Sequence, residues 1–257
     1  MQIATNPDHH CKNCGALFSG QYCNQCGQKE AHRLDTPHVL HEVLHVFTHA
    51  DKGIFSLVPG ILLRPGLVAL DYVNGKRKRH FNVFQYLILI VGFVTFIIAK
   101  THLMEQMMEV MNPDSAKSTR VLAVQKKLLG FTQQYMNFIL FALIPVLAFF
   151  SWRFFKKKGY NYAENVVLQV LIQAQINTFT LLIIIPLALL GAKAKSLYFL
   201  LSIILLAFCN TIANRQFFKV SWPTAFFKGL LVYLGMNLVQ IIIIIIVMLV
   251  IISNKWY

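Results

Sequence analysis

Charged residues are scarce in this chain, and acidic residues are the scarcest. Only 13% of the 257 residues are charged, with 24 Lys and Arg against 10 Asp and Glu. Hydrophobic residues make up 56% of the chain, which includes 21 Phe and has a mean hydropathy of +0.57. This composition is too apolar for a soluble domain of this length. We therefore expect an integral membrane protein.

Long apolar runs after residue 80 predict about five transmembrane helices, because each approaches or exceeds the ~20 residues that span a bilayer. The runs extend from about Phe84 to Ala99, Tyr135 to Trp152, Val166 to Leu190, Leu197 to Ala213 and Gly229 to Ser253. They contain no Asp, Glu or His, which argues against a proton pump or an ion-coupled transporter. No apolar stretch lies near Met1, so no cleavable signal peptide is expected.

The basic residues beside these runs predict the orientation of the chain in the membrane. They gather before the first run, between the second and third, and between the fourth and fifth: Lys76 to Arg79, Arg153 with Lys156 to Lys158, and Arg215, Lys219 and Lys228. Cytoplasmic loops are enriched in Lys and Arg, so these loops and the N-terminus should be cytoplasmic. The loop from residue 100 to 134 carries both signs of charge and is expected outside.

The chain has only five cysteines, and four of them form two CxxC turns, each followed by glycine: Cys11, Cys14, Cys23 and Cys26. This spacing is typical of four thiolates around one tetrahedral metal ion. Two disulfides, a redox CxxC pair and an iron site remain alternatives. We favour a structural Zn²⁺ because of this spacing, and thiols that stay reduced in the cytoplasm bind metal rather than pair. A closed four-thiolate site leaves no open position for catalysis.

Such a ribbon is too small to fold without its metal. Leu17, Phe18 and Tyr22 are the apolar residues expected to form its miniature core. The ribbon could also present a surface to a protein partner.

Histidines recur along a helix that is expected to begin at Thr36 and Pro37. These four histidines are spaced three, four and four residues apart, so they share one helix face and could bind a second metal ion: His38, His41, His45 and His49. His41 to His45 also matches HExxH, in which the histidines bind catalytic zinc and Glu42 would be the general base.

The histidine helix has a simpler interpretation, which we prefer. Its histidines could form the polar face of an amphipathic helix at the membrane surface. A three-ligand site on one helix is awkward, because His38 and His49 lie ~16 Å apart along its axis. Catalysis at His41, Glu42 and His45 is therefore an alternative hypothesis.

The segment that joins this helix to the first apolar run is short, apolar and interrupted by Pro59 and Gly60, so it should lie at the membrane interface. It ends in a basic run that could hold anionic lipid headgroups, formed by Lys76, Arg77, Lys78 and Arg79. The same charges are explained by membrane topology alone. Nucleic acid is not expected as a partner, because most of the excess charge lies in membrane loops.

Polar residues recur on one face of the third apolar run: Asn165, Gln169, Gln173, Asn177 and Thr180. Uncharged amides in a membrane helix usually bond to neighbouring helices. They could also line a polar passage for a lipid or a small solute.

Several short motifs occur in a fixed order along the chain: Cys14-Gly15, Tyr22 to Gln28, His41 to His45, Ala50 to Gly53, Leu62 to Gly66, and Tyr72 to Arg77. In this order they resemble the bacterial membrane family catalogued as domain of unknown function 3667. The resemblance is dense over residues 11 to 85. Tyr160 to Asn165 resembles a second signature of the family, with Asn165 where a histidine is expected. The resemblance implies a zinc ribbon joined to several helices in the bacterial inner membrane, and no activity.

Together these patterns predict an all-α integral membrane helical bundle with a four-cysteine zinc ribbon and an interfacial amphipathic region. The expected parts are the ribbon (1–32), the amphipathic region and basic junction (33–81), and the bundle (82–257). We expect a non-enzymatic adaptor or assembly protein. A membrane-embedded metal-dependent enzyme and a lipid or solute passage protein are the alternatives. The sequence does not determine the oligomeric state.

Overall fold

The computed structural model describes residues 9–37, 39–40, 57–78, 81–105, 119–190 and 192–253. The candidate residues of the histidine helix, and the last member of the basic run, lie outside the described residues: His38, His41, Glu42, His45, His49 and Arg79.

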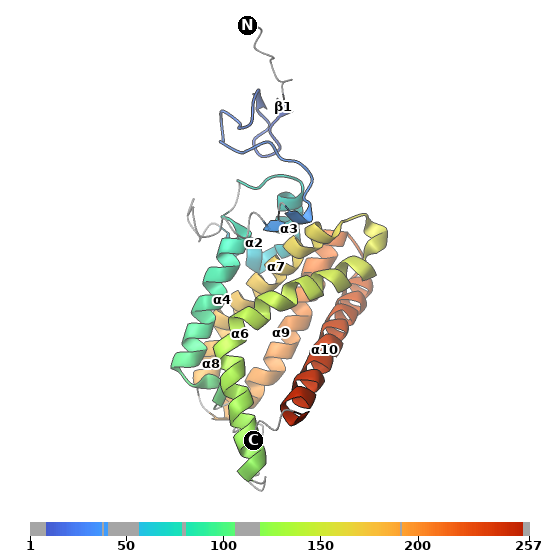
Figure 1. Ribbon diagram of the computed structural model, residues 1–257. Coiled ribbons are helices and arrows are strands. Elements are labelled where there is room, and N and C mark those ends of the chain that lie inside the picture. Colours follow the sequence, from blue (N-terminus) through green and yellow to red (C-terminus); the bar gives the residue numbers. More distant parts are fainter. Residues whose placement is uncertain are drawn as a thin grey trace.

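Helices dominate the described chain, and a small two-stranded ribbon lies at one end of them (Figure 1). The ribbon contains β1 (His9–His10) and β2 (Leu17–Phe18), which pair antiparallel. The helices are α2 (Val58–Leu63), α3 (Pro65–Val73), α4 (Val83–Lys100), α6 (Thr119–Phe154), α7 (Tyr162–Phe179), α8 (Ile185–Leu189), α9 (Ala192–Phe218) and α10 (Trp222–Ser253). A 3₁₀ turn, η3 (Lys156–Lys158), follows α6, and a π-helical turn, η4 (Thr180–Ile184), joins α7 to α8.

Five helical segments are long and apolar enough to cross a membrane, as predicted. They are Val83–Lys100, Gln134–Phe154, Tyr162–Leu187, Leu200–Phe218 and Trp222–Ile243. The third begins four residues earlier than the apolar run suggested, so it includes Glu164, which is buried. A carboxylate therefore lies inside a spanning helix, contrary to the expectation that the spans hold none.

The side chains of the bundle are distributed as in a membrane protein. Large apolar side chains face outward, such as Phe96 and Phe138, which are 63% and 75% exposed. Amide side chains face inward, such as Gln169 and Gln175 of α7, which are fully buried. Lipid solvates apolar surface as well as a protein core does, whereas polar groups need partners inside the bundle.

The short helices α2 and α3 pack into the bundle beside α7 and α9. Leu57 and Ile61 are completely buried, and Tyr72 packs edge-on against Phe84 of α4. Gly66 lies so close to α9 that an added Cβ would collide with the carbonyl of Ala213. A close helix crossing of this kind requires glycine.

The break between α2 and α3 is stabilised by two glutamines of the spanning helices. Pro65 begins α3 and has no N–H, so carbonyls at the end of α2 need other donors. Gln175 Nε2 donates to Leu62 O at 2.9 Å, and Gln216 Nε2 donates to Leu63 O at 3.3 Å. Gln216 Oε1 also accepts from the amide of Gly66 at 3.0 Å. The LLRPG sequence is thus fixed to α7 and α9.

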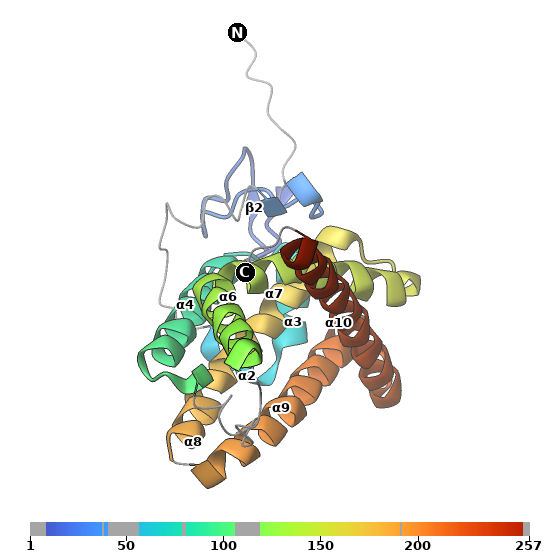
Figure 2. The same ribbon diagram turned by 60° about the horizontal axis from the view of Figure 1, so that its bottom comes forward.

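Two prolines coincide with irregular stretches of the spanning helices. Pro145 lies inside α6, which changes direction along its length in both views (Figures 1 and 2). Pro186 follows the π-helical turn at Thr180–Ile184. Both irregularities have a proline as their physical cause, because its ring clashes with the preceding turn and it lacks an amide proton.

Candidate metal centre and its contact with the helices

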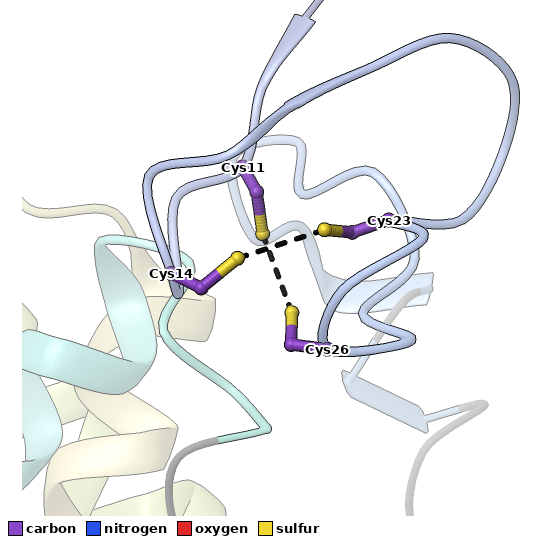
Figure 3. Close-up of side chains that lie close together, drawn as sticks. All are labelled: Cys11, Cys14, Cys23 and Cys26. Carbon is purple, nitrogen blue, oxygen red and sulfur yellow. Dashed lines mark hydrogen bonds between the residues drawn. The ribbon is translucent and has the colours of Figure 1, made fainter.

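The four cysteines of the ribbon point toward one another (Figure 3). Their sulfur atoms all lie within 4.8 Å of one another, and the pairs Cys11–Cys26 and Cys14–Cys23 are separated by 3.5 Å and 3.6 Å. Each CxxC turn is closed by a hydrogen bond that the backbone N–H of its glycine donates. Gly15 donates to Cys11 O and Gly27 to Cys23 O, both at 2.8 Å. Both glycines have positive φ angles, +81° and +66°, which disfavour other residues. The sequence therefore builds two matching turns that face each other.

This geometry fits a four-thiolate metal site. Sulfurs at about 2.3 Å from a tetrahedral ion would lie about 3.8 Å from one another. All four thiols are free, and their separations far exceed a disulfide bond of about 2.05 Å. The predicted ligands are therefore brought together, and they form the one such cluster among the described residues.

The cysteine pKa values are shifted by the surroundings of each thiol. At Cys26, desolvation opposes ionisation, but hydrogen bonds from Asn13 and the Gln28 backbone lower the pKa to about 6. At Cys14, the Ala16 backbone favours the thiolate, but desolvation and the three neighbouring sulfurs raise the pKa to about 12. Crowded sulfurs of this kind are suited to a divalent cation, which stabilises all four thiolates.

The apolar core of the ribbon is smaller than predicted. Phe18 packs against Cys11 and Cys23 and is 4% exposed. The expectation for Leu17 and Tyr22 is wrong, since they are 62% and 57% exposed. Successive strand residues face opposite sides, so Leu17 points outward when Phe18 points inward. The metal cluster has to replace the missing apolar core.

Gln28 fastens the ribbon to the basic junction. Its side chain is buried, and Nε2 donates to Gly75 O at 2.5 Å. Oε1 accepts from the backbone amides of Arg77 and Lys78, each at 3.1 Å. One amide thus pairs with three backbone groups of a segment about 50 residues away along the chain.

Gly75 makes this approach feasible. Its φ is +95°, and an added Cβ would lie 2.8 Å from Lys12 Cδ and 2.9 Å from Ala31 Cβ. Lys12 Nζ donates to Ala31 O at 2.7 Å, which ties the first cysteine turn to the chain that leaves the ribbon. Glycine is therefore required here both by the backbone conformation and by the contact.

A second contact joins the ribbon to the start of α7. Arg33 donates from Nε and Nη2 to the two carboxylate oxygens of Glu164, at 2.8 Å and 3.1 Å. Its Nη2 also donates to Gly159 O at 2.9 Å. Hydrogen bonding and the charge of Glu164 raise the pKa of Arg33, which remains cationic. The fork geometry fixes Arg33 against one end of the bundle.

Glu164 is held in place by the N-terminus of its own helix. Asn161 caps α7 by accepting from the amide of Glu164 at 2.9 Å, and Glu164 accepts in return from the amide of Asn161 at 2.8 Å. This capping box places a carboxylate where the helix dipole favours it. Asn161 Nδ2 also donates to Leu34 O at 2.7 Å. The YNYAEN signature thus binds the segment that leaves the ribbon, through contacts with Arg33 and Leu34.

The predicted headgroup-binding residues are partly engaged with protein. Lys76 pairs with Asp71 at 2.9 Å, and Arg77 donates to His32 O at 2.9 Å. Headgroup binding by this run stays a prediction.

The histidine helix does begin where expected. Residues 36–37 and 39–40 are helical, and Val39 N donates a hydrogen bond to Asp35 O at 3.1 Å. Its metal or catalytic role stays a hypothesis, because the candidate residues lie outside the described part.

Two side chains on the polar face of α7 form hydrogen bonds with neighbouring helices. Asn165, at the position where a histidine was expected, accepts from Ser151 Oγ of α6 at 2.8 Å. Gln173 approaches Tyr233 Oη of α10 at 3.5 Å. Gln169 is fully buried, and its amide atoms bond to no described residue. Asn177 and Thr180 donate instead to carbonyls one turn earlier in their own helical segment. Asn165 and Gln173 therefore join α7 to neighbouring helices.

Sequence reasoning missed Gln28, Arg33 and Glu164 as functional residues. Gln28 and Glu164 belong to the recognised motifs, but a motif does not state its contact. Arg33 and Glu164 are 131 residues apart, and no local pattern in one sequence pairs them.

The fold and the cysteine cluster define a multi-pass membrane protein of five apolar helices that carries an N-terminal four-cysteine ribbon able to hold a metal ion. Residues 51–96 match the family model described as "Protein of unknown function (DUF3667)", which confirms the predicted resemblance over that segment. The matched segment contains α2, α3 and most of α4. Searches of curated proteins and of solved structures gave no match.

Proposed function

We propose that this protein is a non-enzymatic membrane adaptor, in which a structural zinc ribbon is held rigidly on a helical bundle and presents a surface to a protein partner. The observation that carries the proposal is the double attachment of the ribbon, through Gln28 to residues 75–78 and through Arg33 to Glu164. An anchor of this kind gives the ribbon a defined orientation relative to the membrane. A flexible tether would leave it free to rotate.

The chemistry of the ribbon supports zinc and argues against catalysis there. Four thiolates close the coordination shell of Zn²⁺, so no position remains for water or substrate. The metal then stabilises the fold of the ribbon, and through Gln28 and Arg33 it also stabilises the attachment to the bundle.

The distribution of positive charge supports a cytoplasmic ribbon. Contacts between loops place several basic segments at the end of the bundle that carries the ribbon. Lys158 Nζ reaches Lys219 O at 3.4 Å, Lys228 Nζ donates to Phe154 O at 2.9 Å, and Arg77 donates to the ribbon itself. Cations at one end of a bundle favour the cytoplasmic side, and a bacterial inner membrane fits the family resemblance.

The surface of the ribbon supports a protein partner. Leu17 and Tyr22 are the large apolar side chains that the ribbon leaves exposed, at 62% and 57%. Exposed Leu and Tyr are suited to an interface, and Tyr is frequent at binding hot spots. The attachment to the bundle holds them in place before any partner binds, which lowers the entropic cost of association.

Photo-crosslinking in cells tests this proposal. A photoreactive amino acid in place of Tyr22 should trap a defined protein, and the same amino acid in place of Trp222 serves as the control. Trp222 is 49% exposed and begins α10 at the same end of the bundle. Cys14→Ser should abolish the Tyr22 crosslink by unfolding the ribbon. Equal products from both positions, or a crosslink that survives Cys14→Ser, would contradict the adaptor role.

Three further measurements separate the parts of the proposal. Metal analysis of purified protein should give one zinc per chain, and two would favour the enzyme hypothesis. A cellular phenotype that requires His41 and His45 but tolerates Cys14→Ser would also favour that hypothesis. In inverted vesicles a membrane-impermeant maleimide should add one label per chain to a Lys157→Cys variant beyond the labelling of the wild-type cysteines, and in intact cells it should add none. The opposite result would reverse the orientation.

A further inference from the structure

A cavity of about 300 Å³ lies where the ribbon meets the bundle. Its walls come from four parts of the chain that are distant in sequence: Lys12 of the first cysteine turn, Arg33 of the chain leaving the ribbon, Asn74 after α3, and the segment from Lys158 to Glu164. The volume is at the lower end of the range for small-molecule sites. The cavity exists only because the ribbon is attached.

The walls of this cavity carry an excess of positive charge. Three basic residues line it, Lys12, Arg33 and Lys158, together with one carboxylate, Glu164. That carboxylate already accepts two bonds from Arg33. Lys12 and Lys158 have no carboxylate partner among the residues that the structure describes, and each donates there to a single backbone carbonyl, Ala31 O and Lys219 O.

Arg33 is preorganised for a ligand in this cavity. Its Nε and Nη2 are held by Glu164 and Gly159 O, so the guanidinium plane is fixed. Within the described residues, Nη1 makes no hydrogen bond, and it remains a charged donor. A fixed guanidinium that lines one cavity together with two lysines matches a ligand that has several acceptor oxygens and a double negative charge.

We propose that this cavity binds a phosphate group. Phosphate supplies up to two negative charges and several strong acceptor oxygens, which would complete the bonding of Lys12, Arg33 and Lys158. Tyr160 lines the cavity and lies two residues before the spanning helix that starts at Tyr162. The site is therefore close to the level of lipid headgroups. The phosphate could belong to an anionic lipid or to a soluble molecule. The proposal does not depend on a protein partner.

The test uses the full metal-loaded protein in phosphatidylcholine nanodiscs. In one arm, inorganic phosphate is titrated against chloride at constant ionic strength, and the thermal midpoint is measured. In the other arm, the nanodiscs contain phosphatidic acid, and retained lipid is counted by native mass spectrometry. Binding in the first arm points to a soluble phosphate, and binding in the second arm alone points to a lipid.

The variants are Lys158→Gln, Lys12→Gln and the matched control Lys157→Gln. Lys157 lies on the same exposed turn as Lys158 but does not line the cavity. Loss of one charge-assisted contact should weaken binding about tenfold in Lys158→Gln and Lys12→Gln. Lys157→Gln should bind like the wild type. Metal content checks the fold of Lys12→Gln, since Lys12 also holds Ala31.

Absence of binding in both arms overturns the proposal. Equal losses in Lys158→Gln and Lys157→Gln also overturn it, because they would mean general attraction to a basic surface. An intact, metal-loaded Lys158→Gln variant that binds as tightly as the wild type has the same consequence.

Discussion

Replacing Gln28 by Leu would remove the amide that fastens the ribbon while keeping a side chain of similar size. The substitution eliminates three hydrogen bonds, to Gly75 O and from the amides of Arg77 and Lys78. At about 1 kcal/mol net for each bond, the attached state should lose about 3 kcal/mol. That loss corresponds to on the order of a 100-fold shift toward detachment. The estimate is a lower bound if the freed backbone groups stay buried without partners.

Hydrogen exchange of residues 75–78 reports this shift directly, because the amides of Arg77 and Lys78 are the groups that Gln28 protects. Exchange is slow when an amide is bonded and is set by the population of the open state. We expect exchange in this segment to accelerate on the order of 100-fold in Gln28→Leu, while the segments inside α7 exchange as before.

Gln25→Leu is the matched control, since Gln25 lies in the same cysteine turn with its side chain exposed. It should leave exchange in residues 75–78 unchanged. Equal protection of this segment in Gln28→Leu and Gln25→Leu would refute the reasoning that one buried amide carries the attachment. A metal content below that of the wild type in Gln28→Leu alone would show instead that Gln28 acts within the ribbon.

Three further predictions concern the bundle, the helix cap and the metal. Gly66→Ala should destabilise the bundle by about 1–3 kcal/mol in reversible detergent unfolding, because its Cβ would collide with α9. Gly92→Ala, in open space on α4, should be neutral or stabilising, and equal effects of the two changes would contradict this. Asn161→Ala should cost about 1 kcal/mol by removing the cap of α7, whereas the exposed Asn24→Ala should cost nothing in the same assay. Acid should release the metal, because the thiolates that bind it become protonated as the pH falls. Metal analysis from pH 8 to 5 should show progressive loss of the metal, and hydrogen exchange in the ribbon should become faster. Full retention of the metal at pH 5 would count against four thiolate ligands.

The spanning helices were predictable because their signal is local. A membrane helix satisfies its own backbone and faces lipid, so an apolar run of sufficient length defines it without any information about its neighbours. The predicted boundaries differ from the observed ones where polar residues continue a helix. The third span, for example, begins at Tyr162 with a capping box, and not at the first residue of the apolar run.

The metal cluster was predictable for a similar reason. Two CxxC turns, each with a glycine at positive φ, set the direction of two thiolates in each turn by local geometry alone. The fate of Leu17 and Tyr22 was not predictable in this way. Which side chain of the strand Leu17–Phe18 faces inward depends on its pairing with β1, and Tyr22 is placed by a separate bridge to Lys29; composition reveals neither pairing.

The sequence by itself therefore determined the class of this protein: about five apolar helices, one four-cysteine ribbon, and a predominance of positive charge in the loops. Only the tertiary structure decided how the ribbon and the bundle are joined. The contacts of Gln28 with residues 75–78 and of Arg33 with Glu164 connect segments about 50 and 131 residues apart. Such contacts depend on the packing of the whole bundle, because each partner must first be held in place by its own helix or turn. The same packing creates the basic cavity, which belongs to no single segment of the chain.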